Sequence, residues 1–164
     1  MIQRQLGTTD LTVSPVALGC WPIAGMTSLG TTEADSLATI RACFDVGINF
    51  LDTAFMYGAD GESERLIARA VGDRRDEMVI ATQGGLGWNQ QGQREHDARP
   101  ATLRRQCETS LQRLNTDRID LLFLHAPDPD TPVGESAAEL ARLHDEGKAV
   151  AIGASNLSLQ QLDE

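Results

Sequence analysis

The sequence predicts an α/β fold in which a parallel sheet forms part of a TIM (β/α)₈ barrel. Three observations favour this fold: apolar runs alternate with amphipathic stretches, no glycine-rich nucleotide turn follows the first run, and polar residues stand where several runs end. Alternating strands and helices build a parallel sheet because right-handed crossovers return each strand in the same direction. The predicted architecture is an N-terminal hairpin, about four βα units and a fifth strand.

The strands are predicted from short apolar runs. Residues 2–13 have the pattern of a hairpin that turns at residues 8–10. Continuous apolar runs are typical of parallel strands, which are buried on both faces. Five such runs follow the hairpin, at residues 16–18, 48–51, 78–82, 119–124 and 149–153.

The helices are predicted from apolar spacing and from their end signals. Thr31 or Thr32 is a suitable N-cap for the first helix, and Gly47 stands where a C-terminal glycine belongs. Pro100 favours the first turn of the third helix, and Gly147 ends the fourth. The predicted helices are residues 32–46, 63–71, about 100–114 and 134–146, and a fifth begins near the end of the chain.

The positions of the polar residues favour a barrel over a doubly wound sheet. A dinucleotide-binding doubly wound sheet carries a G-x-G-x-x-G turn after its first strand, and Leu18-Gly19-Cys20-Trp21-Pro22 lacks that pattern. In a (β/α)₈ barrel, the carboxyl ends of the strands form the catalytic face. Polar residues at the predicted strand ends are Asp52, Gln83, His125, Ser155 and Asn156.

Length and composition predict one domain over residues 1–164. The chain has 164 residues, of which 41% are hydrophobic, enough for a core of its own. Its longest apolar stretches, such as residues 119–124, are far shorter than the roughly 20 residues that span a membrane. The N-terminus also lacks a basic and then apolar signal pattern, so a cytoplasmic location is the expectation.

Charge and cysteine spacing exclude several kinds of partner. The net charge is −10 with no block of basic residues, which argues against binding to nucleic acid. Cys20, Cys43 and Cys107 are widely spaced and fit no paired motif. We therefore expect reduced, structural cysteines and no metal site.

One segment carries a specific family resemblance. Residues 47–58 are Gly-Ile-Asn-Phe-Leu-Asp-Thr-Ala-Phe-Met-Tyr-Gly, followed by Ser63-Glu64. This segment resembles the signature of the aldo-keto reductases, and further matches occur at residues 18–21, 121–125 and 153–156. The ordered matches cover the whole chain, which resembles the N-terminal half of that family's barrel.

The resemblance implies roles for three residues. In that family a nicotinamide cofactor passes a hydride to a carbonyl carbon while a tyrosine hydroxyl protonates the oxygen, and Tyr57 matches this proton donor. His125 matches the histidine that orients and polarises the carbonyl, and Asp52 matches a carboxylate of the catalytic site that also adjoins the cofactor. Outside the motif, a packed tyrosine, a capping aspartate and a structural histidine would be the ordinary interpretations. His96 and His144 match no motif and are expected to be structural.

Gln83 departs from the family pattern. Relatives have a lysine at this position, whereas here strand residues 79–83 end in a neutral amide. A cation within about 4–6 Å typically lowers a neighbouring pKa by one to three units, and Tyr57 lacks that help. We expect Gln83 to hydrogen-bond both Asp52 and the Tyr57 hydroxyl, which would preserve the arrangement and weaken its electrostatics.

Other residues are expected to surround the substrate and the cofactor. Trp21, Trp88 and Met56 resemble the apolar walls of the family's carbonyl pocket, with general packing as the alternative. Ser155 and Asn156 match residues that bind the nicotinamide carboxamide; otherwise they would cap a fifth helix. Residues 84–99 form a long polar connection, as substrate loops often do.

The resemblance leaves three functional classes open. The first is an NADPH-dependent reductase of small aldehydes or ketones, with NADH as the other cofactor; the second is a weak or inactive half-barrel that serves in binding or assembly. The third is a barrel enzyme of different chemistry with Asp52 and His125 as an acid–base pair. A complete barrel takes about 250 residues, so this chain is expected to be incomplete at its C-terminus and to pair its strand edges with a second copy or with a complementing half.

Overall fold

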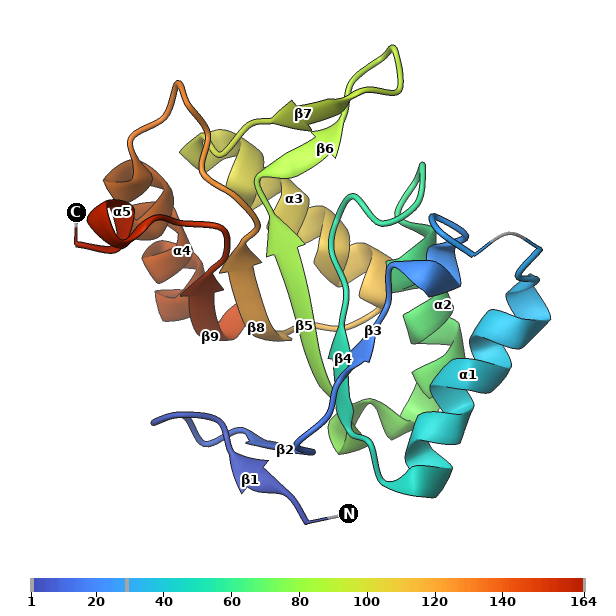
Figure 1. The fold of residues 1–164 in the computed structure, drawn as a ribbon. Helices are drawn as coiled ribbons and strands as arrows, with labels where there is room; N and C mark the ends of the chain where they lie inside the picture. Colours follow the sequence, from blue (N-terminus) through green and yellow to red (C-terminus); the bar gives the residue numbers. More distant parts are fainter. Residues whose placement is uncertain (1, 29, 164) are drawn as a thin grey trace.

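The computed structural model describes residues 2–28 and 30–163. In this part of the chain, five parallel strands form one sheet in the order β3-β4-β5-β8-β9, which is their order in the sequence (Figure 1). The strands are β3 (Leu18–Gly19), β4 (Phe50–Asp52), β5 (Val79–Gly84), β8 (Ile119–Leu124) and β9 (Ala149–Ala154). The domain boundaries predicted at Met1 and Glu164 lie outside the described residues.

The helices cover one face of the sheet, as Figure 1 shows. They are α1 (Glu33–Val46), α2 (Glu62–Val71), α3 (Pro100–Leu114) and α4 (Val133–Asp145), with a short α5 (Leu159–Leu162) near the C-terminus. A doubly wound sheet has helices on both faces and a strand order that reverses. Sequential strands with helices on one face instead form part of a (β/α)₈ barrel, so the predicted fold class is confirmed.

Local signals set the helix ends. The Thr32 side chain accepts a hydrogen bond from the Asp35 backbone N–H at the start of α1, and Asp35 bonds back to the Thr32 N–H. Gly47 ends α1 with a φ of 76°, a conformation that glycine adopts without strain. Pro100 starts α3 as predicted. Ser158, and not the Ser155-Asn156 pair, caps α5.

Alternation along the strands separates two apolar layers. Leu122 and Leu124 of β8 point towards the helices and join the main core with residues of α1 to α4. Leu121 points to the other face, where a smaller cluster includes Leu6 and Leu11 of the N-terminal hairpin. That hairpin, β1 (Arg4–Gln5) and β2 (Thr12–Val13), confirms the predicted turn at residues 8–10.

A buried ion pair lies at the amino end of the sheet. Arg75 extends from the 3₁₀ helix η2 (Gly72–Glu77), and its Nη2 lies 2.7 Å from Oδ2 of Asp120 in β8. The same carboxylate oxygen accepts the Ile80 backbone N–H at 2.8 Å. Asp120 therefore joins η2, β5 and β8.

The connection between β5 and α3 is more regular than its composition suggested. It contains an antiparallel hairpin, β6 (Leu86–Trp88) and β7 (Arg94–His96), which stands above the carboxyl end of the sheet (Figure 1). The Asn89 carboxamide oxygen accepts two backbone N–H groups across its turn. Residues 84–99 are thus a folded arm and not an irregular loop.

Candidate active site

A cavity of about 500 Å³ opens at the carboxyl end of the strands. It brings together residues that are far apart in the sequence, from the loops after β3, β4, β8 and β9 and from the β6–β7 hairpin. Its lining consists of Trp21, Met56, Tyr57, Leu86, Arg94, His96, His125, Ala126, Pro127 and Asn156. Five predicted site residues therefore share one cavity.

Tyr57 lies in a tightly held turn after β4. The Phe55 N–H donates to the Gln83 carbonyl at 3.0 Å, and the Tyr57 N–H donates to the Ala54 carbonyl at 3.0 Å. Arg113 of α3 reaches the same turn and donates to the Phe55 carbonyl at 3.0 Å. The edge of the Trp21 ring meets Tyr57 at a centroid distance of 5.0 Å. The phenol is consequently fixed in position, with its ring packed and half-buried.

Burial raises the pKa of Tyr57, and the Asp52 carboxylate adds to the rise. The positive charge of Arg94 acts in the opposite direction and lowers this pKa. The phenol therefore stays protonated at neutral pH, which keeps a proton available for donation.

Gln83 pairs with Asp52 beneath Tyr57. Asp52 is aligned with Ala81 of β5, so Gln83 occupies the next position that points to the same face. The Gln83 Nε2 donates to Asp52 Oδ1 at 2.9 Å. Within the described residues, no hydrogen bond joins Gln83 to the Tyr57 hydroxyl, so that half of the expectation is wrong, while the bond to Asp52 is present.

Asp52 has a neutral partner in a partly buried site. Desolvation raises the pKa of its carboxyl group, and the hydrogen bond from Gln83 opposes the rise only in part. A lysine in the place of Gln83 would stabilise the charged carboxylate more strongly than an amide does.

His125 follows β8 and lies edge-on to Tyr57, with ring centroids 5.9 Å apart. Desolvation lowers the pKa of the imidazole from 6.5 to about 4, and the charges of Arg94 and His96 add to the decrease. Its Nδ1 is buried and has no hydrogen-bond partner in the described part of the chain. A neutral ring with its proton on Nε2 fits this environment, because it buries no unpaired N–H at Nδ1.

The predicted apolar walls occupy two different places. Trp21 and Met56 line the cavity itself. Trp88 does not line it. The indole N–H of Trp88 donates to the Met56 carbonyl at 2.7 Å, and the Trp88 ring packs against the small cluster that contains Met56 and Leu86. Trp88 thus ties the hairpin to the loop that carries Tyr57.

Asn156 reaches the cavity and Ser155 lies beside it. Asn156 has a φ of 61°, and its side-chain Nδ2 donates to the His125 carbonyl at 2.7 Å. This contact leaves the Asn156 amide oxygen available as an acceptor. The Ser155 backbone N–H donates to the Leu124 carbonyl, which continues the β8–β9 pairing as far as the site.

Arg94 and His96 are the ionisable residues of the cavity lining that were not predicted as site residues from the sequence. His96 was expected to be structural, yet it lines the cavity together with Tyr57 and His125. Both residues lie on β7 at positions i and i+2, which places them on one face of the strand. That spacing was the available signal, but nothing in the local sequence identified the segment as a strand.

A buried cluster of Glu64, Thr82 and Arg113 packs against the turn that precedes Tyr57. Glu64 of α2 is fully buried, and its Oε1 accepts the Thr82 hydroxyl at 2.7 Å. Its Oε2 lies 3.3 Å from Nη1 of Arg113, whose guanidinium group also stacks 4.5 Å from the Phe55 ring centroid. The cluster connects α2, α3 and β5 to the turn before Tyr57.

The remaining chemistry-bearing residues form no second centre of this kind. Cys20, Cys43 and Cys107 are buried and free of disulfides. Among the residues that the structure describes, no group of three or more His, Cys, Asp or Glu side chains is placed to hold a metal ion. Across the same residues, none of the helices combines the length and the apolar character that crossing a membrane requires.

Comparisons with known proteins agree with this arrangement. The family model described as "Aldo/keto reductase family" matches residues 15–164. The chain is 41% identical over 165 residues to the aldo-keto reductase YhdN of Bacillus subtilis, an alignment that covers 99% of this chain and 49% of the relative. The chain thus spans about half the length of the curated relatives it matches.

Two solved structures are similar over almost the whole chain. The glycerol dehydrogenase AKR11B4 from Gluconobacter oxydans matches with a TM-score of 0.88 and 40% identity, covering 98% of this chain and 50% of its own. The aldo-keto reductase AKR11C1 from Bacillus halodurans, described as a holo form, matches with a TM-score of 0.86 and 34% identity over 99% of this chain and 53% of its own. The strand ends and the cavity above them therefore lie in the shared half of these barrels.

Proposed function

The chain belongs to the aldo/keto reductase family of oxidoreductases, and we propose that it contributes the proton-donating site of an NADPH-dependent reductase of small aldehydes or ketones. The observation that carries this proposal is the placement of Tyr57 beside His125 at the same cavity, with Asp52 beneath it. A protonated phenol next to a neutral imidazole suits donation of a hydrogen bond and then a proton to a carbonyl oxygen.

Tyr57 acts as the general acid in this proposal. Its raised pKa keeps the hydroxyl protonated, and its packing against Trp21 limits the movement of the ring. As negative charge develops on the carbonyl oxygen, the hydroxyl first hydrogen-bonds that oxygen and then transfers its proton. The same raised pKa makes Tyr57 a weak acid, because Asp52 and burial both disfavour the phenolate left behind.

His125 positions the carbonyl. With its proton on Nε2, the neutral ring presents a donor to the cavity, whose lining it shares with Tyr57. Two donors directed at one oxygen fix the orientation of the substrate and polarise its C=O bond. The lowered pKa of His125 means that this ring supplies a hydrogen bond without a full positive charge.

The residues at the end of β9 fit a nicotinamide group. The Asn156 amide oxygen is an acceptor at the cavity, and Ser155, which precedes it in the chain, has a hydroxyl group that can donate or accept. These groups match the hydrogen-bonding needs of a carboxamide, whose NH₂ donates and whose oxygen accepts. A nicotinamide cofactor, when bound, supplies the hydride; we propose NADPH on the basis of the family, with NADH as the alternative.

Gln83 favours a second candidate, a catalytically weak or inactive half-barrel that serves in binding or assembly. No lysine lies at the site to stabilise a Tyr57 phenolate, since the chain's single lysine is Lys148, which pairs with Glu146 and Glu108. The two candidates differ in rate, so turnover distinguishes them.

The test follows the oxidation of NADPH with 4-nitrobenzaldehyde as the substrate. We expect turnover that falls by about a hundred-fold to ten-thousand-fold in Tyr57→Phe, because general acid catalysis typically contributes that much. The phenylalanine ring keeps the contact with Trp21, so the unfolding midpoint should stay close to that of the unchanged protein. His144→Gln on α4 is the control that should retain the rate. Turnover that survives Tyr57→Phe would remove the assigned role, and no turnover in the unchanged chain would favour the binding module.

A further inference from the structure

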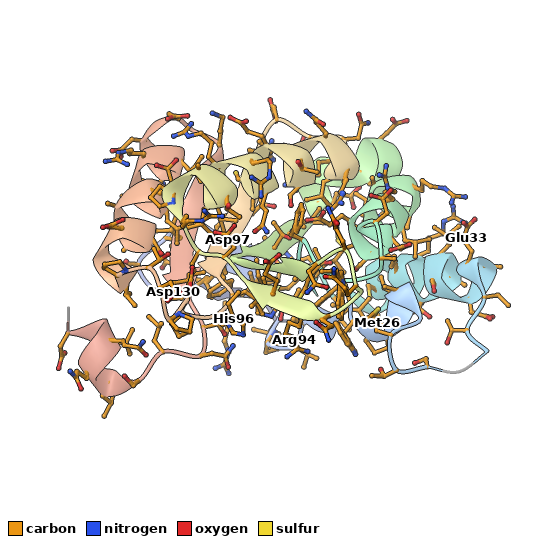
Figure 2. The ribbon with its side chains drawn as sticks, turned by 90° about the horizontal axis from the view of Figure 1, so that it is seen from above. Met26, Glu33, Arg94, His96, Asp97 and Asp130 are labelled. Carbon is orange, nitrogen blue, oxygen red and sulfur yellow. The ribbon has the colours of Figure 1, made fainter. Side chains whose placement is uncertain are left out.

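The β6–β7 hairpin brings a cation to the cavity. Arg94 and His96 line it from β7, in the same lining as Tyr57 and His125. Figure 2, seen from above, shows both on one side of the hairpin, while Asp97 lies towards α3. Glu95 alternates to the other face and borders a separate cavity with Asp97 and the β8–α4 loop, which His96 also touches. The hairpin therefore presents its basic residues to the site and its acidic ones elsewhere.

Arg94 has no ion-pair partner among the described residues. Nine of the other arginines form ion pairs with carboxylates in the described part of the chain, at Arg65, Arg69, Arg74, Arg75, Arg99, Arg104, Arg113, Arg118 and Arg142. Arg94 forms none there, although the chain carries 24 acidic residues against 14 basic ones. The positive charge of Arg94 instead acts on the cavity residues, where it lowers the pKa of both Tyr57 and His125.

His96 is oriented by one contact. Its Nδ1 lies 3.0 Å from the Pro127 carbonyl oxygen, which can only accept, so Nδ1 carries the proton. The Pro127 carbonyl thereby fixes the ring on the cavity wall and leaves Nε2 for a ligand. Arg94 and His96 together add polar groups to the lining that Tyr57 and His125 share.

The cavity lining contains one arginine, two histidines and no carboxylate among the described residues. This balance is unusual in a chain with a net charge of −10. A guanidinium group presents paired N–H donors that match the two oxygens of a carboxylate. An uncharged substrate would leave those donors to water.

We propose that Arg94, assisted by His96, makes this site selective for carbonyl compounds that also carry a carboxylate. The inference rests on the proposed function and adds a substrate class to it. The carbonyl lies between Tyr57 and His125, and the carboxylate at the far end of the molecule meets Arg94 on the hairpin. Arg94 acts as a specificity-determining residue, and the proton transfer remains with Tyr57.

The experiment compares two substrates of nearly equal size, 4-formylbenzoate and its methyl ester. Arg94→Gln should lower kcat/KM for 4-formylbenzoate by about ten-fold, mainly through KM, because a hydrogen bond between charged groups is lost. The ester has no carboxylate to lose, so its kcat/KM should fall clearly less, only by the part that Arg94 contributes through the pKa of Tyr57. Added salt should reduce the preference of the unchanged protein in the same direction.

Arg41→Gln provides a matched control. Arg41 lies on α1, is exposed and forms no ion pair with the described residues, so its removal changes the net charge equally and leaves the cavity intact. This variant should keep the selectivity. An equal loss for both substrates in Arg94→Gln, or an unchanged selectivity, would overturn the proposal.

A binding measurement separates this proposal from the proposed function. Trp21 lines the cavity, so its fluorescence reports the binding of cyclohexanecarboxylate and of cyclohexanecarboxamide, which absorb no exciting light. If the chain turns over neither aldehyde, the reductase proposal fails for this chain. The fluorescence titrations then test the anion site without any need for turnover. Tighter binding of the carboxylate that disappears in Arg94→Gln supports the anion site; equal binding of the two ligands contradicts it.

Discussion

The two ends of the sheet each hold a carboxylate, and the two carboxylates have different partners. At the amino end, Asp120 receives the Arg75 guanidinium at 2.7 Å and the Ile80 N–H at 2.8 Å. At the carboxyl end, Asp52 receives one neutral amide from Gln83 at 2.9 Å. One carboxylate is neutralised by a cation, and the other is left with a raised pKa.

This difference separates stabilisation from chemistry. A buried carboxylate with a cation and a backbone donor has its charge compensated, so it joins elements and does little else. Asp52, Tyr57 and His125 all have shifted pKa values, and His125 Nδ1 lacks a partner among the described residues. Unsatisfied groups of this kind are typical of sites that interact with a ligand. Asp52, Tyr57 and His125 thus lie together at the end of the sheet where a (β/α)₈ barrel holds its active site.

Removal of Asp120 should produce the largest effect on stability. Asp120→Ala leaves the Arg75 guanidinium, whose side chain is only 15% exposed, without its anion and the Ile80 N–H without an acceptor. Breaking a buried pair in this way costs about 3 kcal/mol or more. The free energy of unfolding in urea measures the loss, and Asp120→Asn should lose less because it keeps an acceptor for Ile80.

The matched control is an exposed pair from the same region. Asp76 lies 2.6 Å from Arg118, but its side chain is 86% exposed. Asp76→Ala should leave the free energy of unfolding almost unchanged, since surface pairs are screened by water. Equal losses in Asp76→Ala and Asp120→Ala would show that burial does not distinguish the two pairs.

A cation introduced next to Asp52 should give the carboxyl end of the sheet a charge-compensated carboxylate, as Arg75 does for Asp120 at the amino end. In Gln83→Lys, the new ammonium group lies next to Asp52 and beneath Tyr57. The Tyr57 phenolate gains an attractive charge, so the pKa of Tyr57 should fall, and the rate of carbonyl reduction should rise by about ten-fold. Tyr57 is the only tyrosine in the chain, so a spectroscopic titration of phenolate absorbance reports this pKa directly.

Gln112→Lys is the control for the added charge. Gln112 is exposed on α3, away from the Asp52 pair, so its replacement should leave the Tyr57 titration unchanged. A Tyr57 pKa that stays constant in a folded Gln83→Lys protein would contradict the electrostatic interpretation of the site.

Much of the fold could be predicted because its signals are local. Apolar runs marked the parallel strands, Thr32 and Gly47 marked the ends of α1, and Pro100 marked the start of α3. The strand ends converge in any (β/α)₈ barrel, so the sequence also predicted that Tyr57 and His125 would meet.

The hairpin and its site residues could not be predicted in the same way. The segment from Arg94 to His96 is exposed and wholly polar, so no apolar alternation identified it as a strand. Its face towards the cavity depends on pairing with β6 and on the bond from Trp88 to Met56, which are contacts of the folded chain. The contacts of Gln83 depend likewise on how β4 and β5 are aligned in the sheet. The sequence alone therefore did not show whether its amide would bond Asp52, the Tyr57 hydroxyl or both.

The smallest predicted effect concerns the pH dependence of stability. The His125 pKa is about 4 in the folded protein and 6.5 in an exposed imidazole, so the unfolded chain binds more protons between these values. The protein should therefore lose stability as the pH falls from 6.5 towards 4. Because the ring is partly exposed, we expect a contribution on the order of 1 kcal/mol, well below the full value of the shift.

His125→Gln isolates this contribution, because glutamine keeps a polar side chain that does not titrate. The unfolding free energy of the variant should fall less steeply between pH 6.5 and pH 4 than that of the unchanged protein. His144→Gln, on the exposed surface of α4, should keep the original slope. Identical slopes in all three proteins would mean that His125 is not desolvated in the folded state, and the contrast between the two ends of the sheet would then rest on Asp52 and Tyr57 alone.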